Sequence, residues 1–276
     1  FTIAKGEFLG KLSGSSDSSY TSVKDRNWQK YRTTYVFDQM DAKEKALYNE
    51  LESVCMDYIK NSSKDAINMG GNYYLPAVSI EAFDDESYVD VLQMFIYSNP
   101  QYYFTTMKYG FNSYEKKLFM YCFPSFADGD DRAEVTNSLF DTADEWLSDI
   151  TDGNTGSISI EKAAHDYICE NVSYDYDAAD KLANNEYSEQ IYQTQTVYST
   201  FTKGATVCAG YSLAYELLLN AAGIPTVATY SDCHAWNKVY LGDCGKWYAV
   251  DVTWDDDANG STIDYHFYKN DSLSLI

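Results

Sequence analysis

A helix pattern followed directly by three strand patterns constrains the fold of this chain more than any other feature of its sequence. Residues 208–222 place apolar side chains at helical spacing, and Gly223 is the kind of residue that ends a helix. The three runs that follow are rich in β-branched and aromatic residues and span residues 226–230, 235–241 and 246–252. A helix that precedes antiparallel strands predicts an α+β fold. The helix face expected to be buried consists of Leu213, Leu217, Leu218 and Ala221.

The last two strand patterns flank Gly242–Gly245, a sequence that is typical of a hairpin turn. A turn centred near residues 243–244 requires that the numbers of paired positions sum to about 487. The residue numbers of His234 and Asp251 add up to 485, close to that value, so we expect the two residues to face each other across the hairpin. Side chains opposed in this way are about 5 Å apart at Cβ, which suits a carboxylate that orients an imidazole.

Cys208 opens the predicted helix, directly after Gly204–Val207. The unpaired N–H groups and the positive end of the dipole at a helix N-terminus stabilise a thiolate, which is the nucleophilic form of cysteine. The same N–H groups can hold the oxyanion of a tetrahedral intermediate. Gly210 has no side chain and is expected to leave room for a substrate beside the sulfur. From position alone, a buried structural cysteine remains the alternative.

Cys208, His234 and Asp251 supply a nucleophile, a general base and a carboxylate that orients the base. A lone cysteine or histidine is most often structural, but here the helix start and the hairpin bring all three roles into one short stretch of chain. We therefore predict that these three residues form a catalytic triad.

Several separate motifs around the predicted triad occur in the order found in a known enzyme superfamily. They are Gly204–Ser212, Ala222–Pro225, His234–Asn237 and Trp247–Asp256, preceded by His165–Asp175 and followed by Asp264–Phe267. Together, over about residues 158–270, they resemble the core of the transglutaminase-like superfamily. The resemblance is closest to its bacterial secreted branch.

The resemblance implies a papain-like α+β domain in which the predicted triad carries out acyl transfer. Tyr198 matches the aromatic position of the branch and is expected to line the oxyanion site, and Gly210 and Trp236 are expected to line the substrate site. Of the remaining histidines, His165 is predicted to be a core or surface residue, and His266 to be structural or to support the triad without belonging to it.

The N-terminal half of the chain is predicted to be mainly helical and to add no chemistry. Apolar residues recur at helical spacing in residues 41–60, 86–97 and 132–150. The aromatic stretches 102–111 and 118–126 are typical of strands or of buried irregular segments.

A cluster of turn-forming residues at 151–156 predicts a boundary between this region and the catalytic domain; a loop within one body is the alternative. We expect a flexible leader at residues 1–22, a mainly helical region at residues 23–152 and the catalytic domain at residues 153–276. The serine-rich segment 13–19 is of the kind that follows a cleaved signal or an anchor, which favours a secreted or cell-surface protein.

Charge excludes two classes of partner. The chain has 42 acidic and 20 basic residues and a net charge of −22, so nucleic acids and anionic membranes would be repelled. No stretch of about 18 apolar residues is present to span a bilayer. The expected partner is a protein or peptide substrate.

The six cysteines contain no CxxC pair and form no Cys/His cluster at zinc-ligand spacing, so no cofactor is predicted. Cys233 and Cys244 should not bond to each other, because some nine residues of strand would separate them by roughly 30 Å. The acidic stretches Asp128–Asp131 and Asp255–Asp257 lack calcium-loop spacing and are expected to be solvated loops. The family motif gives Asp255 or Asp256 an alternative role in the fold.

Three functions fit the predicted triad. The first is hydrolysis of amide bonds in proteins, peptides or cell-wall peptides through a Cys208 thioester; the second is protein cross-linking; the third is a non-catalytic binding module, which an intact triad disfavours. About twenty residues follow the core, too few to shield a thioester from water, which favours hydrolysis. The N-terminal region could supply such a shield, and strong acidity would attract lysine-rich partners, so cross-linking stays open.

Overall fold

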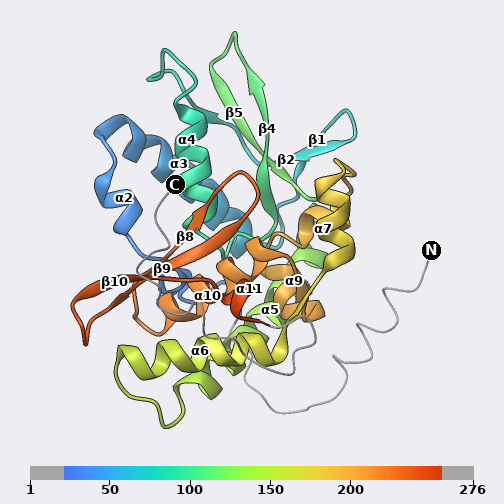
Figure 1. Ribbon diagram of the computed structural model, residues 1–276. Helices are drawn as coiled ribbons and strands as arrows, with labels where there is room; N and C mark the ends of the chain where they lie inside the picture. The colour runs from blue at the N-terminus through green and yellow to red at the C-terminus, as the bar shows by residue number, and fades with distance from the viewer. Residues whose placement is uncertain (1–21, 257–276) are drawn as a thin grey trace.

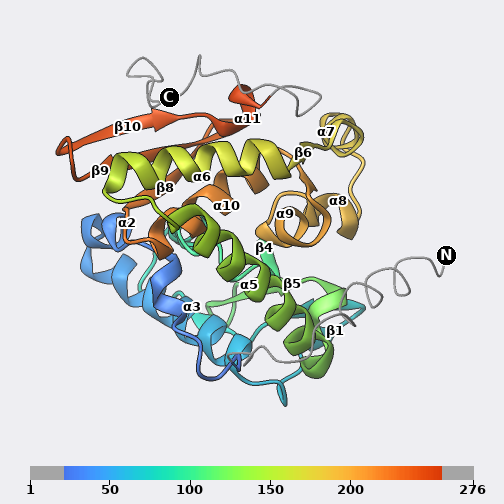
Figure 2. The same cartoon turned by 90° about the horizontal axis from the view of Figure 1, so that it is seen from below.

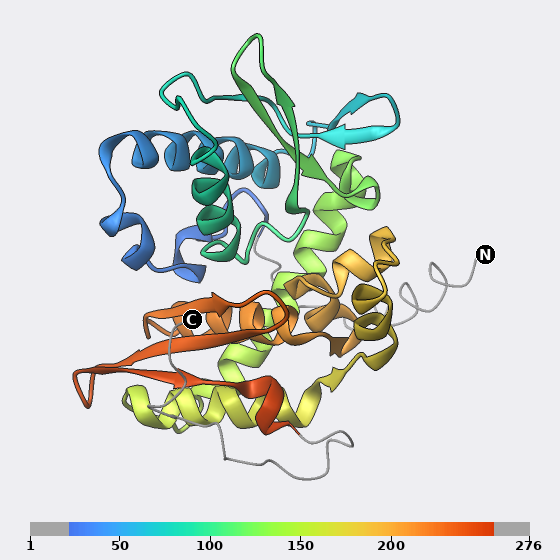
Figure 3. The same cartoon turned by 45° about the horizontal axis from the view of Figure 1, so that its top comes forward.

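The computed structural model of the protein describes residues 22–256 (Figure 1). Nearly all of the leader predicted at residues 1–22, the strand motif Asp264–Phe267 and His266 lie outside these residues. Within residues 22–256, no helix combines the length and the apolar character needed to cross a membrane. The helices and strands form two parts on either side of the turn at residues 152–156, and Figure 3 shows the N-terminal part, in blue to green, above the C-terminal part, in yellow to red.

The N-terminal part combines helices with a five-stranded antiparallel sheet. Strand β5 is its central strand, because it pairs with β2, β3 and β4, and β1 extends the sheet beyond β2. The elements are η1 (Trp28–Tyr31), α2 (Tyr35–Gln39), α3 (Ala42–Lys60), β1 (Ile67–Met69), β2 (Asn72–Tyr74), β3 (Val78–Ser79), α4 (Tyr88–Tyr97), β4 (Thr105–Asn112), β5 (Lys117–Cys122), η2 (Pro124–Phe126) and α5 (Gly129–Thr151).

The three long helices predicted in this part are confirmed. Helix α3 begins at a capping box, in which the Asp41 carboxylate accepts from the backbone N–H of Glu44 and the Glu44 carboxylate accepts from that of Asp41. Helix α4 ends two residues before Asn99–Pro100, as the proline rule predicts. Strands β4 and β5 overlap the aromatic stretches 102–111 and 118–126, for which the sequence predicts strands or buried irregular segments. The difference from the prediction lies in β1, β2 and β3. Strand β1 is exposed and β2 is half-buried throughout, so neither shows the alternation that marks a strand in sequence.

The C-terminal part has a three-stranded antiparallel sheet in the order β10-β9-β8 and a short parallel pair, β6 and β7. Its helix α10 packs on strands β8 and β9, which confirms the α+β prediction. The elements are α6 (Ser157–Asn171), β6 (Ser173–Tyr174), α7 (Tyr176–Ala183), α8 (Glu189–Gln193), α9 (Val197–Lys203), β7 (Ala205–Thr206), α10 (Cys208–Ala221), β8 (Thr226–Tyr230), β9 (Ala235–Leu241), β10 (Lys246–Val250) and α11 (Val252–Asp255).

The register of the β9–β10 hairpin agrees with the prediction. Lys246 pairs with Leu241 at the turn, and Val250 pairs with Asn237 at the other end. The residue numbers of every pair add up to 487, the total expected from the position of the turn. A residue with positive φ, Gly245, completes the turn. His234 and Asp251 therefore lie just beyond the same end of the hairpin.

Helix α10 is the central element of the C-terminal part, and its burial differs from the prediction. Every residue from Ala209 to Asn220 is buried, rather than one apolar face, because β8, β9, α6, α9 and η1 surround the helix. Polar side chains link it to the sheet. The Asn237 side chain donates to the Ser212 carbonyl (2.9 Å), and the Glu216 carboxyl accepts from the Ala228 N–H (3.0 Å). These contacts fix the helix that begins at Cys208 against the strand that follows His234.

Helix α5 connects the two parts. It packs against α3 and η2 of the N-terminal part and against α6, α9 and α10 of the C-terminal part. Figure 2 shows α5 beside α6, with α3 on the opposite side. The two parts thus share one long helix as well as a covalent link.

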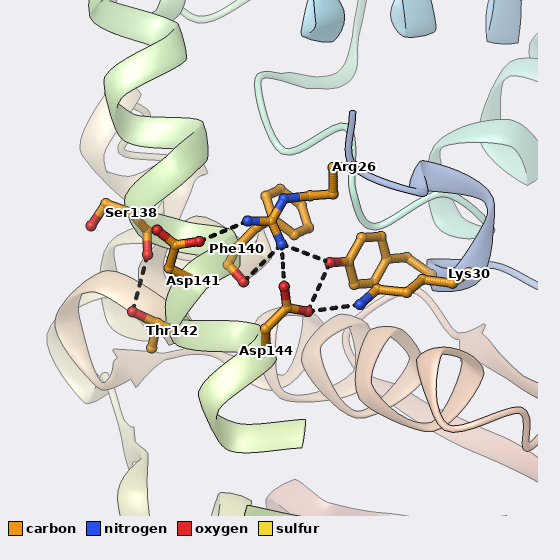
Figure 4. A network of polar contacts seen from close by, with 8 residues as sticks. Arg26, Lys30, Ser138, Phe140, Asp141, Thr142 and Asp144 are labelled. Atoms are coloured by element: carbon orange, nitrogen blue, oxygen red, sulfur yellow. Dashed lines mark hydrogen bonds and ion pairs between the residues drawn. The ribbon is translucent and has the colours of Figure 1, made fainter. Parts of the chain in front are cut away.

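A buried arginine fixes the start of the described chain to this helix (Figure 4). The guanidinium of Arg26 donates to the carboxylates of Asp141 (2.8 Å) and Asp144 and to the carbonyl of Phe140 (3.2 Å). Lys30 adds a second bond to Asp144 (2.8 Å). Because Arg26 is buried, these partners compensate a charge that could not otherwise leave water.

Candidate active site

Cys208 is the first residue of α10 and lines a cavity of about 520 Å³. The preceding residue is held in place because the Val207 N–H donates to the Thr194 carbonyl (3.2 Å). Cys208 is partly exposed, unlike the buried residues Ala209–Asn220 that follow it. The N–H groups of Cys208 and Ala209 belong to the first turn, where a helix offers no internal acceptor, so they are available to an oxygen at the thiol.

The imidazole of His234 connects a carboxylate to the thiol. Its Nε2 lies 2.6 Å from Oδ2 of Asp251, and its other hydrogen-bonding partner is Cys208, which leaves Nδ1 to face the sulfur. The second oxygen of the buried Asp251 accepts from the Trp254 N–H (3.1 Å), because Asp251 caps helix α11. The Trp254 ring is stacked on the imidazole at 4.4 Å. The structure thus brings together the three residues of the predicted triad.

The surroundings of His234 favour its protonated form. Burial lowers the pKa of the imidazole, but its hydrogen bonds to Asp251 and Cys208 outweigh burial and raise the pKa to about 9. At neutral pH the ring therefore carries a proton that it can give to a leaving group. A protonated imidazole beside a sulfur also favours a thiolate–imidazolium pair.

Residues 144–252 match the family model described as the transglutaminase-like superfamily. This segment is a transglutaminase-like domain. Three chains of solved structures also match, among them a "Crystal structure of a TGase" with 16% sequence identity and a TM-score of 0.38. That match covers 54% of this chain and 44% of the solved chain, so this chain spans less than half of that structure. No curated protein sequence matches significantly. The boundary predicted at residues 152–153 and the assignment to the bacterial secreted branch stay predictions.

The N-terminal part forms one wall of the cavity above the transglutaminase-like domain. Residues from Ile96 to Met107 line it from one side, and residues of α7, α8, α10 and the turn after β8 line it from the other. The rings of Tyr97 on α4 and Tyr230 on β8 stack 3.7 Å apart, which joins the two walls. The shield that the sequence leaves open for the N-terminal region therefore has a counterpart in this wall. No local sequence pattern reports which of its residues take part, because the contacting segments lie so far apart in the chain.

The roles predicted for Gly210 and Tyr198 at the substrate and oxyanion sites are also corrected. Gly210 does not leave room for a substrate: a Cβ there would lie 1.9 Å from Oγ1 of Thr206, so glycine is required for close packing of α10 on the preceding segment. Tyr198 is not among the residues that line the cavity. Its ring packs on Tyr103 and Phe126 instead, at 6.1 and 5.0 Å.

Trp236 lies beside the site without lining the cavity. It is buried on β9, and its ring is 6.0 Å from the His234 imidazole and nearly parallel to it. In the described residues Trp236 thus packs beside the imidazole and not among the residues that line the cavity.

The acidic run after β10 is not a solvated loop. Asp255 is fully buried, and its Oδ2 lies 3.2 Å from Nε2 of His165 on α6, while Asp256 accepts from the Tyr211 hydroxyl. His165 also contacts Asp166 (3.0 Å). Burial lowers the pKa of His165, but the bonds to Asp166 and Asp255 outweigh it and raise the pKa above its ordinary value. This buried ion pair fixes α11, and hence Asp251, to α6.

No metal site accompanies the triad in the described chain. Residues 22–256 contain no group of three or more His, Cys, Asp or Glu side chains that could hold a metal ion. In the other acidic run, Asp128 caps helix α5 by accepting from the N–H of Asp130 and Asp131.

The six cysteines differ sharply in environment. Cys55, Cys122 and Cys169 are buried, and burial raises the pKa of each thiol, that of Cys122 to about 12. Cys233 and Cys244 are exposed and unbonded, at opposite ends of β9 as predicted. The competition for a thiol reagent is thus between Cys208 and these two exposed residues.

We expect iodoacetamide to label Cys208 before any other cysteine near neutral pH. The helix start and the imidazolium of His234 favour its thiolate, whereas Cys233 and Cys244 lack a comparable partner among the described residues. Labelling followed by peptide mass spectrometry gives the order, and His234→Ala should slow Cys208 without affecting Cys244. Earlier labelling of Cys55, Cys122 or Cys169 in the native protein would contradict the assignment of the nucleophile.

Proposed function

We propose that the protein is a cysteine-dependent acyl-transfer enzyme that acts on amide bonds of proteins or peptides. The observation that carries the proposal is the contact of one imidazole with both Cys208 and the buried Asp251, at the mouth of a cavity. A binding module has no need for a buried carboxylate that raises the pKa of a histidine beside a thiol. The membership of this segment in the transglutaminase-like superfamily supports the same chemistry.

The geometry defines a role for each residue in two half-reactions. The Cys208 thiolate attacks the amide carbonyl carbon, and the negative charge moves to the carbonyl oxygen. The His234 imidazolium gives its proton to the nitrogen as the C–N bond breaks, which leaves a thioester and a free amine. Neutral His234 then takes a proton from water or an amine as that group attacks the thioester. The departing thiolate restores the starting ion pair, and Asp251 keeps the ring oriented throughout.

The first test is to trap the thioester. The protein is incubated with a peptide library, quenched in acid and analysed by mass spectrometry of the intact chain and its peptides. The expected adduct is on Cys208, and Cys208→Ala is the control that should show none. A wild-type chain that forms no adduct with any peptide or small amide would argue for the non-catalytic alternative.

We further propose that water is the usual acceptor and that the enzyme is a hydrolase. A cavity of about 520 Å³ is many times the roughly 30 Å³ that one water occupies, so water can reach the thioester. Two observations favour a cross-linking transferase instead. The wall from Ile96 to Met107 partly encloses the thiol, and the net charge of −22 would attract lysine-rich acceptors.

We expect acid formation to exceed amine incorporation when the protein acts on a glutamine-containing peptide in excess labelled primary amine. Both products are separated and quantified by mass spectrometry, with Cys208→Ala to measure the uncatalysed background. If amine incorporation exceeds acid formation at millimolar amine, the transferase replaces the hydrolase. We also propose that either reaction takes place outside the cytoplasm, on secreted or cell-surface substrates that include cell-wall peptides, because the serine-rich segment 13–19 is of the kind that follows a cleaved signal or an anchor.

A further inference from the structure

The cavity beside Cys208 can hold only part of a peptide chain. Its volume of about 520 Å³ lies in the range of pockets that hold one small molecule. A peptide or protein substrate must therefore leave the cavity and run over the surface next to it. Strand β4 leads out of the cavity, because Thr105–Met107 line it whereas Lys108 and Tyr109 are exposed. Figure 1 shows that the β4–β5 hairpin then points away from α10 and β8.

Strand β4 is an edge strand with an open side. It pairs with β5 and with no other strand of residues 22–256. Apart from that pairing, no hydrogen bond within these residues reaches the backbone of Thr106–Phe111. Every residue of this segment is exposed or half-buried, so the described chain does not cover it. An open strand edge is a template for pairing with a further strand.

The hydrogen bonds of β5 determine which backbone groups of β4 face the open side. The Met120 carbonyl accepts from the Leu75 N–H (2.9 Å), so Met120 directs its backbone groups away from β4. Leu118, two residues earlier, does the same, because backbone groups alternate along a strand. Tyr109 lies opposite Met120, and Phe111 lies opposite Leu118. The N–H and C=O groups of Tyr109 and Phe111 therefore point to the open side, about 7 Å apart along the strand.

The end of β4 at the cavity is irregular. Thr105 and Tyr109 pair with Cys122 and Met120, so β4 advances four residues where β5 advances two. The extra residues lie in the segment Thr106–Lys108, most of which lines the cavity. Bulges of this kind are frequent next to active sites, where they redirect a strand and its side chains. The bulge thus joins the open edge of β4 to the cavity.

Strand β8 also ends at the cavity, but its open side is occupied. It is an edge strand of the other sheet, and its last residue, Tyr230, lines the cavity. The Glu216 carboxyl accepts from the Ala228 N–H (3.0 Å), and the ring of Tyr97 stacks on Tyr230. Of these two edge strands, only β4 has a backbone that is open to a substrate within residues 22–256.

We propose that the open edge of β4 binds an extended segment of the substrate as an added β-strand and leads the scissile amide into the cavity at Cys208. The proposal rests on the acyl-transfer function proposed above, and it narrows the substrates to peptides and flexible protein segments that can pair over several residues. Hydrogen bonds to the backbone of Tyr109 and Phe111 supply affinity without selecting a side chain. No covalent bond changes at this edge.

The first test uses the wild-type protein and a series of peptides. A glutamine-containing peptide that acylates Cys208 is compared with copies that each carry one methylated backbone nitrogen. Along the segment that pairs with β4, methylation should lower kcat/KM about tenfold at every second residue and have little effect between, because alternate residues of a strand face one neighbour. Uniform sensitivity along the peptide, or none, would overturn the proposal.

The second test changes the edge itself. Tyr109→Pro removes an N–H that faces the open side and leaves the pairing with β5 intact, as proline on an edge strand can. We expect kcat/KM for the long peptide to fall about tenfold. Alkylation of Cys208 by iodoacetamide does not need the edge, so its rate should stay at the wild-type value.

The matched control is Asn68→Pro on β1, the edge strand on the other side of the same sheet. Asn68 lies opposite Tyr73, which directs its backbone groups to β5 as Leu75 does, so this N–H also faces an open side. Asn68 does not line the cavity, and both rates should stay unchanged in this variant. If proline unfolds either protein, which circular dichroism would show, the peptide series still decides.

The outcomes separate strand addition from the function on which it rests. Equal kcat/KM for wild type and Tyr109→Pro, or an equal loss in Asn68→Pro, would overturn strand addition and leave acyl transfer intact. Size-exclusion chromatography tests a second copy of the chain as the occupant: a wild-type dimer that becomes a monomer in Tyr109→Pro would assign the edge to self-association and overturn the proposal. A wild-type protein that is alkylated at Cys208 but acylated by no peptide would overturn both.

Discussion

Asp251→Asn is expected to lower kcat about a thousandfold or more while the protein stays folded. The carboxylate of Asp251 lies 2.6 Å from Nε2 of His234 and helps to raise the pKa of that imidazole to about 9. An amide at this position carries no charge, so it neither stabilises the imidazolium nor fixes the tautomer that turns Nδ1 toward Cys208. Both the first proton transfer, to the leaving amine, and the second, from water, depend on that orientation.

The fold should tolerate the change because asparagine is also a good N-cap. Its side-chain oxygen can accept from the Trp254 N–H and keep helix α11 in place. Asp243→Asn is the matched control: it makes the same substitution at the exposed turn of the same hairpin, far from the cavity. We expect circular dichroism to be alike for the three proteins and kcat to fall in Asp251→Asn alone. Normal turnover in that variant would show that another group orients the histidine.

The parts of the site that lie close together in sequence could be predicted. The turn at Gly242–Gly245 determines the register of the hairpin, and the register determines that His234 and Asp251 are neighbours. The start of α10 places Cys208 where a thiolate is favoured. Each inference depended on a period or a local preference that operates within about twenty residues, which is the range over which sequence patterns report geometry.

The parts that depend on distant segments could not be predicted. The stack of Tyr97 on Tyr230 joins residues that no periodic pattern relates, so the sequence does not show which residues of the N-terminal part form the wall. Gly210 was assigned to the substrate because the sequence does not show that Thr206 packs against it. For Asp255 the acidic run favours a solvated loop and the family motif a role in the fold; the structure confirms the second, with a partner, His165, that lies 90 residues earlier. In each case tertiary contact overrode a sound local preference.

The buried pair of His165 and Asp255 provides the second large effect. Asp255→Asn is expected to lower the free energy of unfolding by about 3–5 kcal/mol, because it leaves the protonated imidazole inside the protein without its buried counter-ion. The loss should depend on pH. The pKa of His165 is raised above its unfolded value of 6.5 by Asp166 and Asp255, which outweigh burial. The stabilisation is therefore fully present below about pH 6.5 and is lost as the pH rises through the folded pKa.

Urea unfolding of wild type and Asp255→Asn at pH 6 and at pH 9 measures this dependence, and the difference between the two proteins should be larger at pH 6. Asp166→Asn is the matched control, because Asp166 contacts the same imidazole from a partly exposed position and should cost far less. Asp251 caps the start of helix α11 and Asp255 is its last residue, so a frayed α11 would also release the triad carboxylate. If wild type and Asp255→Asn have equal free energies of unfolding at pH 6 and at pH 9, the pair is not ionised in the folded protein and packing alone holds α11.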